Sequence, residues 1–225
     1  MATSGNISFN LTALEVAQQA TLVNGYRDPD EPLSSADGET CRIHLNLMLK
    51  SWQADGCNLW RETEDSESFI AGDYSETLDP HVIDVMEARV VLSATYERPL
   101  TRWEWGQYVT LPNKTASGDP TIFVVRKQRN AIEMRIWPVP TQTRTVNYTA
   151  ARVVEDVTTL ANDLDIPQEW LECAIYGLAA RLCEPLGVVV ASPNTVARVQ
   201  QRADDLYARM RDMDRPSSII MQGAR

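Results

Sequence analysis

The sequence predicts an α+β protein: N-terminal and C-terminal helices form one discontinuous antiparallel helical bundle, and an antiparallel β domain is inserted between them. Apolar residues recur at helical spacing near both ends of the chain, whereas the middle is rich in Val, Ile, Thr and aromatic residues separated by Gly, Asp and Pro turns. Helices with one apolar face each bury it by packing together. We expect the bundle to comprise 1–57 and 163–215, the β domain 58–162, and a C-terminal tail 216–225.

The first helix is expected to run from Thr12 to about Asn24. Thr12 and Glu15 have the spacing of a capping box, in which each side chain bonds the backbone N–H of the other residue. Its buried face is expected to include Leu14 and Ala17.

A second helix is expected over residues 35–56. Its apolar residues recur at intervals of four, three and four, which places them on one face: Cys41, Leu45, Met48 and Trp52. Gly56 is suited to end this helix, because glycine readily takes the left-handed conformation that follows a helix. The two helices are most simply arranged antiparallel.

After Gly56 the hydrophobic period changes from helical to strand-like. Six segments combine β-branched and aromatic residues with turn residues at their ends, and we expect strands in 58–63, 66–71, 82–93, 121–127, 131–137 and 143–154. About a hundred residues are therefore expected to form antiparallel β structure.

The helical pattern resumes at residue 165. One apolar face is formed by Ile166, Trp170, Ala174, Leu178 and Leu182, until Pro185 and Gly187 end the helix. Ser192 and Pro193 begin a last helix, which Pro216 stops. The residues expected to face inward on it are Val196, Val199, Ala203, Leu206, Met210 and Met213.

Composition and charge exclude several classes of function. The formal net charge of −10 argues against a protein that binds nucleic acid through a general basic surface. The longest apolar run, 188–191, is far shorter than the roughly 20 residues of a membrane span, and the N-terminus lacks a signal-peptide pattern. We expect a soluble, cytosolic protein that does not associate with membranes.

No catalytic or metal-binding pattern is present. The four cysteines, at 41, 57, 173 and 183, form no C-x-x-C pair and are expected to be reduced core residues. His44 and His81 have no catalytic or metal-ligating partner at a suitable spacing. Acidic residues in 62–67 and 204–205 are interpreted as solvated. We therefore expect no enzyme activity, no cofactor and no metal.

Two segments are candidates for interfaces. Residues 101–121 contain Trp103, Trp105 and Tyr108, which either anchor an interface or fill the β core. The C-terminal tail carries an apolar patch, 219–221, that either orders on a partner or packs on its own domain. Both alternatives stay open for each segment.

A series of short motifs resembles the head-to-tail adaptor proteins of tailed bacteriophages, of the type found in short-tailed phages. The resemblance spans roughly residues 10–215. Each motif alone is weak, and it is their order along the chain that makes the resemblance specific. In chain order they are Trp52-Gln53-Ala54-Asp55-Gly56, Leu111-Pro112-Asn113-Lys114-Thr115, Gly118-Asp119-Pro120, Trp137-Pro138-Val139-Pro140, Pro167 to Trp170, and Tyr176-Gly177-Leu178-Ala179.

The resemblance implies a structural protein of the virion: a ring, usually of twelve copies, that docks beneath the portal at the head-to-tail junction. It implies a portal protein, a tail nozzle or hub protein and copies of itself as partners, with assembly in the host cytoplasm. Packaged DNA would pass through an acidic lumen without specific binding. Alternatives are a tail-tube or nozzle component of the same particle and, third, a virion-associated cell-wall hydrolase.

The expected contact residues follow from the same resemblance. Portal contacts are expected in the C-terminal tail, at Arg215, Ile219, Ile220, Met221 and Arg225. Contacts with a neighbouring subunit or with the tail are expected in the β domain, at Trp103, Trp105, Tyr108, Asn113, Lys114 and Asp119. Lys114 is expected to pair with an acidic residue of an adjoining subunit.

Overall fold

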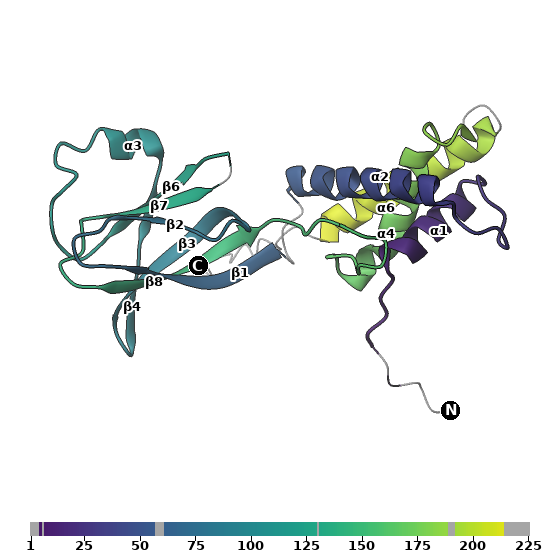
Figure 1. The fold of residues 1–225 in the computed structure, drawn as a ribbon. Helices are drawn as coiled ribbons and strands as arrows, with labels where there is room; N and C mark the ends of the chain where they lie inside the picture. The colour runs from purple at the N-terminus through teal and green to yellow at the C-terminus, as the bar shows by residue number, and fades with distance from the viewer. Residues whose placement is uncertain (1–4, 6, 57–60, 130, 189–191, 214–225) are drawn as a thin grey trace, which may run out of the picture. The chain divides into compact units, whose positions relative to one another are not determined.

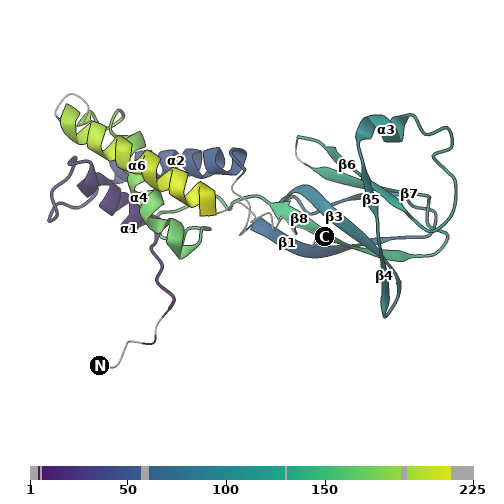
Figure 2. The same ribbon diagram turned by 180° about the vertical axis from the view of Figure 1, so that it is seen from behind.

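The chain folds into two compact units. The computed structural model describes residues 5, 7–56, 61–129, 131–188 and 192–213. One unit is helical and comprises Met1–Trp60 and Val154–Arg225, whereas Arg61–Val153 forms a β unit (Figures 1 and 2). The predicted α+β class is confirmed. Residues 154–162, expected in the β domain, group with the helices.

The helical unit is built around one hydrophobic cluster. It contains α1 (Ala13–Val23), α2 (Ser35–Ala54), the short 3-10 helix η2 (Gln168–Trp170), α4 (Leu171–Leu182) and α6 (Pro193–Met213). Buried side chains of all four α-helices belong to this cluster. The N-terminal and C-terminal parts of the chain therefore share a single core.

The predicted helix start is confirmed, and two predicted core positions are wrong. The backbone N–H of Thr12 donates to Glu15 at 2.8 Å and that of Glu15 donates to Thr12 Oγ1 at 3.3 Å, which completes the capping box. Leu14 is 38% exposed, because the buried face of α1 is set by Ala13 and residues three, four and seven further along. Met213 is 63% exposed, since it lies at the end of α6, past the last side chain that packs on the core.

The β unit is a pair of sheets packed on a shared core. Residues 61–129 and 131–153 contain, in chain order, β1 (Glu62–Phe69), β2 (Ser75–Thr77), β3 (Val82–Ser93), β4 (Tyr96–Pro99), β5 (Thr101–Trp103), α3 (Trp105–Val109), β6 (Ile122–Lys127), β7 (Ile132–Trp137) and β8 (Arg144–Arg152). The strand orders are β1-β8-β3-β4 and β2-β7-β6-β5. Buried side chains from both sheets form one hydrophobic cluster.

Three details of the β unit differ from the sequence-based prediction. The two strands expected at 58–63 and 66–71 are one strand, β1, because its acidic residues lie on a largely exposed edge strand and do not interrupt the pairing with β8. The second sheet is mixed, since β5 pairs in parallel with β6. A parallel pair needs a crossover connection, which α3 and the loop 110–121 supply. The short elements β2, β4, β5 and α3 were not predicted.

Candidate interaction surface of the β unit

The surface begins with α3, the short helix in the crossover between β5 and β6. Its start is fixed by a capping box in which the backbone N–H of Glu104 donates to Gln107 Oε1 at 2.9 Å. Its end is fixed by Lys114, whose Nζ donates to the carbonyls of Val109 and Leu111 at 3.0 and 3.2 Å. A cation placed on terminal helix carbonyls stabilises them. Lys114, expected to pair with an acid on a neighbouring subunit, therefore has partners within its own chain.

The aromatic residues of α3 and β5 divide into a core residue and two surface residues. Tyr108 is 1% exposed and packs with Ile122 and Val124 in a small hydrophobic cluster. Trp103 and Trp105 are only partly buried against this cluster, and the Trp105 and Tyr108 rings lie 5.6 Å apart. The alternatives left open by the sequence thus separate: Tyr108 fills the core, and the tryptophans cover it from outside.

Two arginine side chains lie over the Trp105 ring. The guanidinium carbons of Arg126 and Arg135 each lie 5.0 Å from the Trp105 ring centroid, within the range of a cation–π contact. Arg135 also lies 5.7 Å from the rings of Tyr108 and Tyr74. The half-exposed indole is thereby held in a fixed orientation.

A largely but not fully buried carboxylate, that of Glu133, holds Arg135 in place. Glu133 Oε1 lies 2.7 Å from Arg135, and the Ser75 hydroxyl donates to the same carboxylate. Burial alone would raise the pKa of Glu133, but the hydrogen bonds from Ser75 and Arg135 outweigh it and lower that pKa. Burial opposes charge on Arg135 as well, yet its bond to Glu133 raises the pKa of the guanidinium. Both groups are therefore charged at neutral pH.

The motifs of residues 111–140 meet in space. The indole N–H of Trp137 donates to the carbonyl of Asn113 at 3.0 Å. The backbone N–H of Gly118 donates to Val139 O at 2.9 Å, and the N–H of Val139 donates to Ala116 O at 2.8 Å. The loop is thus bonded to the Trp-Pro-Val-Pro segment, whose Trp137-Pro138 peptide is cis. This pairing gives a non-repetitive loop a defined shape.

The expected contact residues of the β unit do not form one patch. Trp103, Trp105 and Tyr108 belong to one hydrophobic cluster. The Asn113 carbonyl is bonded to Trp137, which packs on this cluster, and Lys114 is bonded to the end of α3. Asp119 instead forms an ion pair with Arg144 at 2.8 Å. The expected portal contacts Arg215, Ile219, Ile220, Met221 and Arg225 lie outside the described residues.

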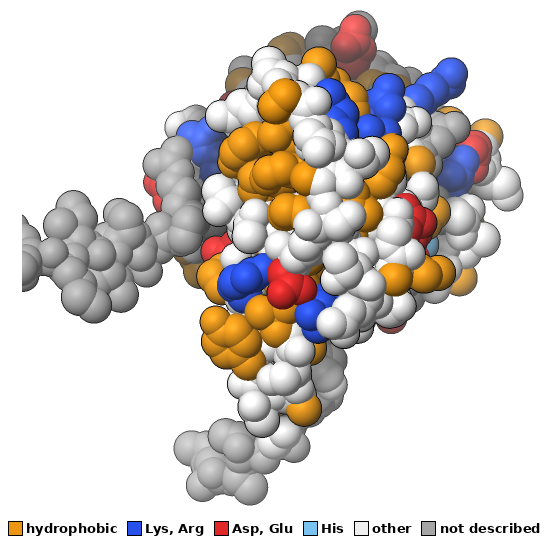
Figure 3. Space-filling model, turned by 90° about the vertical axis from the view of Figure 1, so that its left-hand side faces the viewer, with side chains coloured by type: hydrophobic (Ala, Val, Ile, Leu, Met, Phe, Trp, Pro, Cys, Tyr) orange, Lys and Arg blue, Asp and Glu red, His pale blue; other side chains and the backbone are white. Residues whose placement is uncertain are grey.

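The face that carries α3 is apolar at its centre. Val109, at the end of α3, is 51% exposed, and Trp105, Leu111 and Trp137 are partly buried beside it. Figure 3 shows the β unit from this end, with hydrophobic side chains gathered across the middle of the face and Lys and Arg side chains near its margin. An apolar centre with an arginine-rich margin is typical of protein–protein interfaces.

In the helical unit the motifs also converge, but they are buried. The Trp52 ring lies 5.2 Å from Trp170 and 5.9 Å from Tyr207, whose hydroxyl donates to Asp55 Oδ2 at 2.7 Å. A Cβ atom at Gly177 would lie 2.9 Å from the sulfur of Met48. Trp52, Trp170 and Gly177 of these motifs thus have packing roles. The sequence analysis missed Tyr207, because a single tyrosine on a polar helix face carries no signal of its partners.

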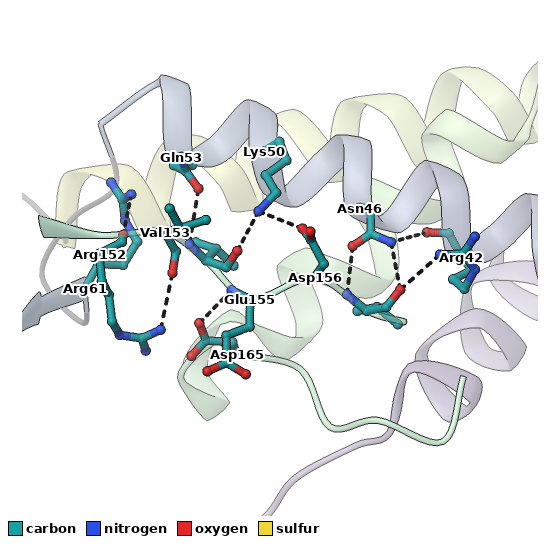
Figure 4. Close-up of polar contacts among 12 residues, drawn as sticks. Arg42, Asn46, Lys50, Gln53, Arg61, Arg152, Val153, Glu155, Asp156 and Asp165 are labelled. Atoms are coloured by element: carbon teal, nitrogen blue, oxygen red, sulfur yellow. Dashed lines mark hydrogen bonds and ion pairs between the residues drawn. The ribbon is translucent and has the colours of Figure 1, made fainter. Parts of the chain in front are cut away.

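A second feature missed by the sequence analysis is a row of polar side chains along α2, here called the polar ladder: Arg42, Asn46, Lys50 and Gln53 (Figure 4). It binds residues 154–157, the segment through which the chain re-enters the helical unit. Asn46 Oδ1 accepts from the N–H of Val157 at 2.8 Å, and the Asn46 amide and Arg42 donate to Val157 O at 2.9 and 3.1 Å. Both backbone groups of Val157 are thereby satisfied.

The other half of the polar ladder holds Val154 in the same way. Gln53 Oε1 accepts from the N–H of Val154 at 3.1 Å, and Lys50 Nζ donates to Val154 O at 2.6 Å. Lys50 also forms an ion pair with Asp156 at 2.7 Å. The spacing of the ladder along the helix, four, four and three, was visible in the sequence, but its partner segment was not.

The described parts of the chain offer neither a cluster of metal-ligating side chains nor a membrane-spanning helix. They hold no group of three or more His, Cys, Asp or Glu residues able to bind a metal ion, and no helix among them is long and apolar enough to cross a membrane. Cys41, Cys173 and Cys183 are buried free thiols. Burial, with a smaller effect of nearby Asp37, raises the pKa of Cys41 to about 11. Cys57 lies outside the described residues.

Comparison with known proteins identifies the family. A model of the family described as SU10 adaptor protein matches residues 11–223. No curated protein matches the sequence significantly. A chain of a solved structure, "Neck of empty GTA particle computed with C6 symmetry", matches at 14% identity and covers 76% of this chain and 81% of that chain. The TM-score of this match is 0.25, which is too low to indicate a shared fold. The match of the family model over nearly the whole chain shows that this protein belongs to the SU10 adaptor family, the head-to-tail adaptors of tailed bacteriophages.

Proposed function

We propose that the protein forms a ring of identical copies, twelve in number, beneath the portal protein at the head-to-tail junction of the virion. The ring continues the DNA channel and gives the tail a platform on which to dock. Membership of the adaptor family is the observation that carries this proposal. The ring is assembled in the host cytoplasm and has a structural role, without catalysis.

The charge of the chain supports passage of DNA through such a ring. Affinity for DNA arises mainly from cations that neutralise phosphates, and this chain has a formal net charge of −10. An acidic lumen repels the packaged DNA weakly and uniformly, so the DNA slides without being held. Specific DNA binding is not part of the proposed function.

The two expected sets of contacts are assigned to different partners. The surface around Trp105 and Val109, to which the Asn113 carbonyl is bonded through Trp137, contacts a neighbouring subunit or the tail nozzle protein, and Asp119 makes a separate contact of the same kind. It is supported by the partly exposed aromatic and apolar side chains there. The C-terminal tail from Arg215 onward contacts the portal.

Binding to purified portal and tail nozzle proteins tests this assignment. A chain ending at Pro216 should bind the portal more weakly than the full chain, while binding of the nozzle protein is unchanged. Equal portal binding by the two chains would contradict the role of the tail. Binding of the full chain to the nozzle alone would favour the alternative, a tail-tube or nozzle component.

A surface variant tests the β unit separately. Val109→Asp places a charge on a side chain that is 51% exposed at the end of α3 and leaves the core residue Tyr108 in place. It should weaken binding between copies or to the nozzle at least about tenfold, because burying an unpaired carboxylate is costly. Tyr96→Asp, at a tyrosine that is 57% exposed on β4, is the matched control. Equal behaviour of the two variants would exclude this face as the interface.

A further inference from the structure

The N-terminal arm of the helical unit, residues 7–11, carries apolar side chains that its own chain does not cover. Ile7 is 87% exposed and Phe9 is 63% exposed, and they alternate with the polar residues Ser8 and Asn10. The arm has no helix or strand of its own and leads away from the helices of its unit (Figures 1 and 2). Only Leu11, at its base, packs on the hydrophobic cluster.

A second uncovered apolar feature lies on α2 of the same unit. Ile43 and Leu47 are 45% and 56% exposed, one helical turn apart. They form the apolar floor of a groove of about 400 Å³, here called the α2 groove, which is otherwise lined by Arg42, Asn46, Lys50 and residues 156–158. Of the polar ladder, Arg42, Asn46 and Lys50 (Figure 4) line the groove beside this floor, together with residues 156–158.

The two features fit each other in spacing and chemistry. An extended chain places every second side chain on one side, about 7 Å apart, and a helix places residues i and i+4 on one side, about 6 Å apart. Ile7 and Phe9 therefore match the separation of Ile43 and Leu47. Residues 7–11 carry no charge, so they can enter an apolar groove without desolvating an ion.

We propose that the arm of one copy of this protein lies in the α2 groove of a second copy. Both features are exposed among the described residues of one chain, so the arm and the groove of the same copy do not cover each other there. Exchange between identical copies covers both at once, and repetition around a closed ring leaves no arm unpaired. The inference rests on the proposed ring and names one contact between its subunits.

Self-association of the full chain, measured by sedimentation equilibrium up to high concentration, tests the exchange without any partner protein. Phe9→Asp and Leu47→Asp should each weaken self-association at least about tenfold, since each places a charge in an apolar contact. Both side chains are exposed, so neither change should unfold the helices. Met213→Asp, at an apolar residue that is 63% exposed on α6, is the matched control. A monomer at every concentration, or variants that behave like the control, would overturn the proposal.

Disulfide cross-linking then establishes which chain supplies the arm. Two preparations, Phe9→Cys and Leu47→Cys, each in a Cys57→Ser background and distinguishable by mass, are mixed under mild oxidation. The proposal predicts a covalent dimer that contains one chain of each kind. A cross-link formed only within the chain of a Phe9→Cys/Leu47→Cys double variant, or no cross-link at all, would overturn it.

Portal binding separates failure of this inference from failure of the proposed function. If the wild-type protein joins the portal in several copies but Leu47→Asp associates normally, the arm exchange is wrong and the ring proposal stands. If the wild-type chains exchange arms but never join the portal, the contact is real and the adaptor function is wrong.

Discussion

The helical unit and the β unit use motifs of similar appearance for different purposes. In the helical unit, Trp52 and Trp170 are 6% and 5% exposed and form part of the main core. In the β unit, Trp105 is only partly buried and carries two arginines over its ring. A tryptophan in a motif can therefore stabilise the core of a unit or form part of its surface.

The difference arises from what each unit can bury. Trp52 of α2 is enclosed by Trp170 of η2, Gly177 of α4 and Tyr207 of α6. The short helix α3 has only one side of a sheet to pack on, so Tyr108 takes the buried place and Trp105 remains at the margin. Substitution of Trp52 should consequently affect mainly the stability of its unit, whereas substitution of Trp105 should affect mainly assembly.

The largest expected effect on stability is that of Trp52→Ala. It removes a large buried ring that contacts Trp170 and Tyr207, and we expect a loss of about 3–5 kcal/mol in the free energy of unfolding of the helical unit. Chemical denaturation followed by far-ultraviolet circular dichroism measures it. A loss below about 1 kcal/mol would mean that this cluster is not central to the core.

The sequence was most informative where residues act within their own helix. The capping box of Thr12 and Glu15 and the stripe from Cys41 to Trp52 depend on local spacing, and the structure confirms both. Leu14 and Met213 were misplaced, because which side of a helix is buried depends on partners that are distant in sequence.

The candidate surface was predicted only in part, for the same reason. Residues 101–121 were singled out correctly as unusual, but the sequence could not separate Tyr108 from the tryptophans or foresee that Lys114 caps α3. The crossover through α3 and the parallel pairing of β5 were also invisible, because such short elements carry too little periodicity. The polar ladder was missed because its partners lie more than a hundred residues away.

The next effect in size is that of Asn46→Ala in the polar ladder. It leaves the backbone N–H of Val157 without its side-chain partner, and we expect a loss of about 1–3 kcal/mol in unfolding free energy. Ser51→Ala, a change from a polar residue to alanine on the same helix, is the matched control and should be less destabilising. If the two variants have equal unfolding free energies, the bond to the Val157 N–H does not stabilise the unit.

A smaller effect on stability is expected for Trp105→Ala in the β unit. The ring is partly exposed, and its removal ends two cation–π contacts, so the expected loss is about 1–2 kcal/mol. The same variant should weaken binding at the candidate surface more than Trp103→Phe does, as measured by calorimetry with the nozzle protein or by self-association. A loss of unfolding free energy as large as that of Trp52→Ala would contradict the contrast between the two units.

The smallest effect is expected for Lys114→Met. It removes the cation from the carbonyls at the end of α3, which is worth less than about 1 kcal/mol because the group is exposed. Denaturation of the β unit and a binding titration, performed on the same preparation, distinguish two roles. Unchanged stability together with a large loss of self-association would instead support the intersubunit ion pair of Lys114 that was expected from the sequence.

The central claim is that this chain assembles on the portal as a multi-copy adaptor. The most direct test is the mass of the protein in solution, alone and mixed with its portal, by light scattering after size exclusion. We predict a complex whose mass corresponds to the portal plus several copies of the chain, twelve for a full ring. Separate elution of the two proteins under every salt condition tested would contradict the claim.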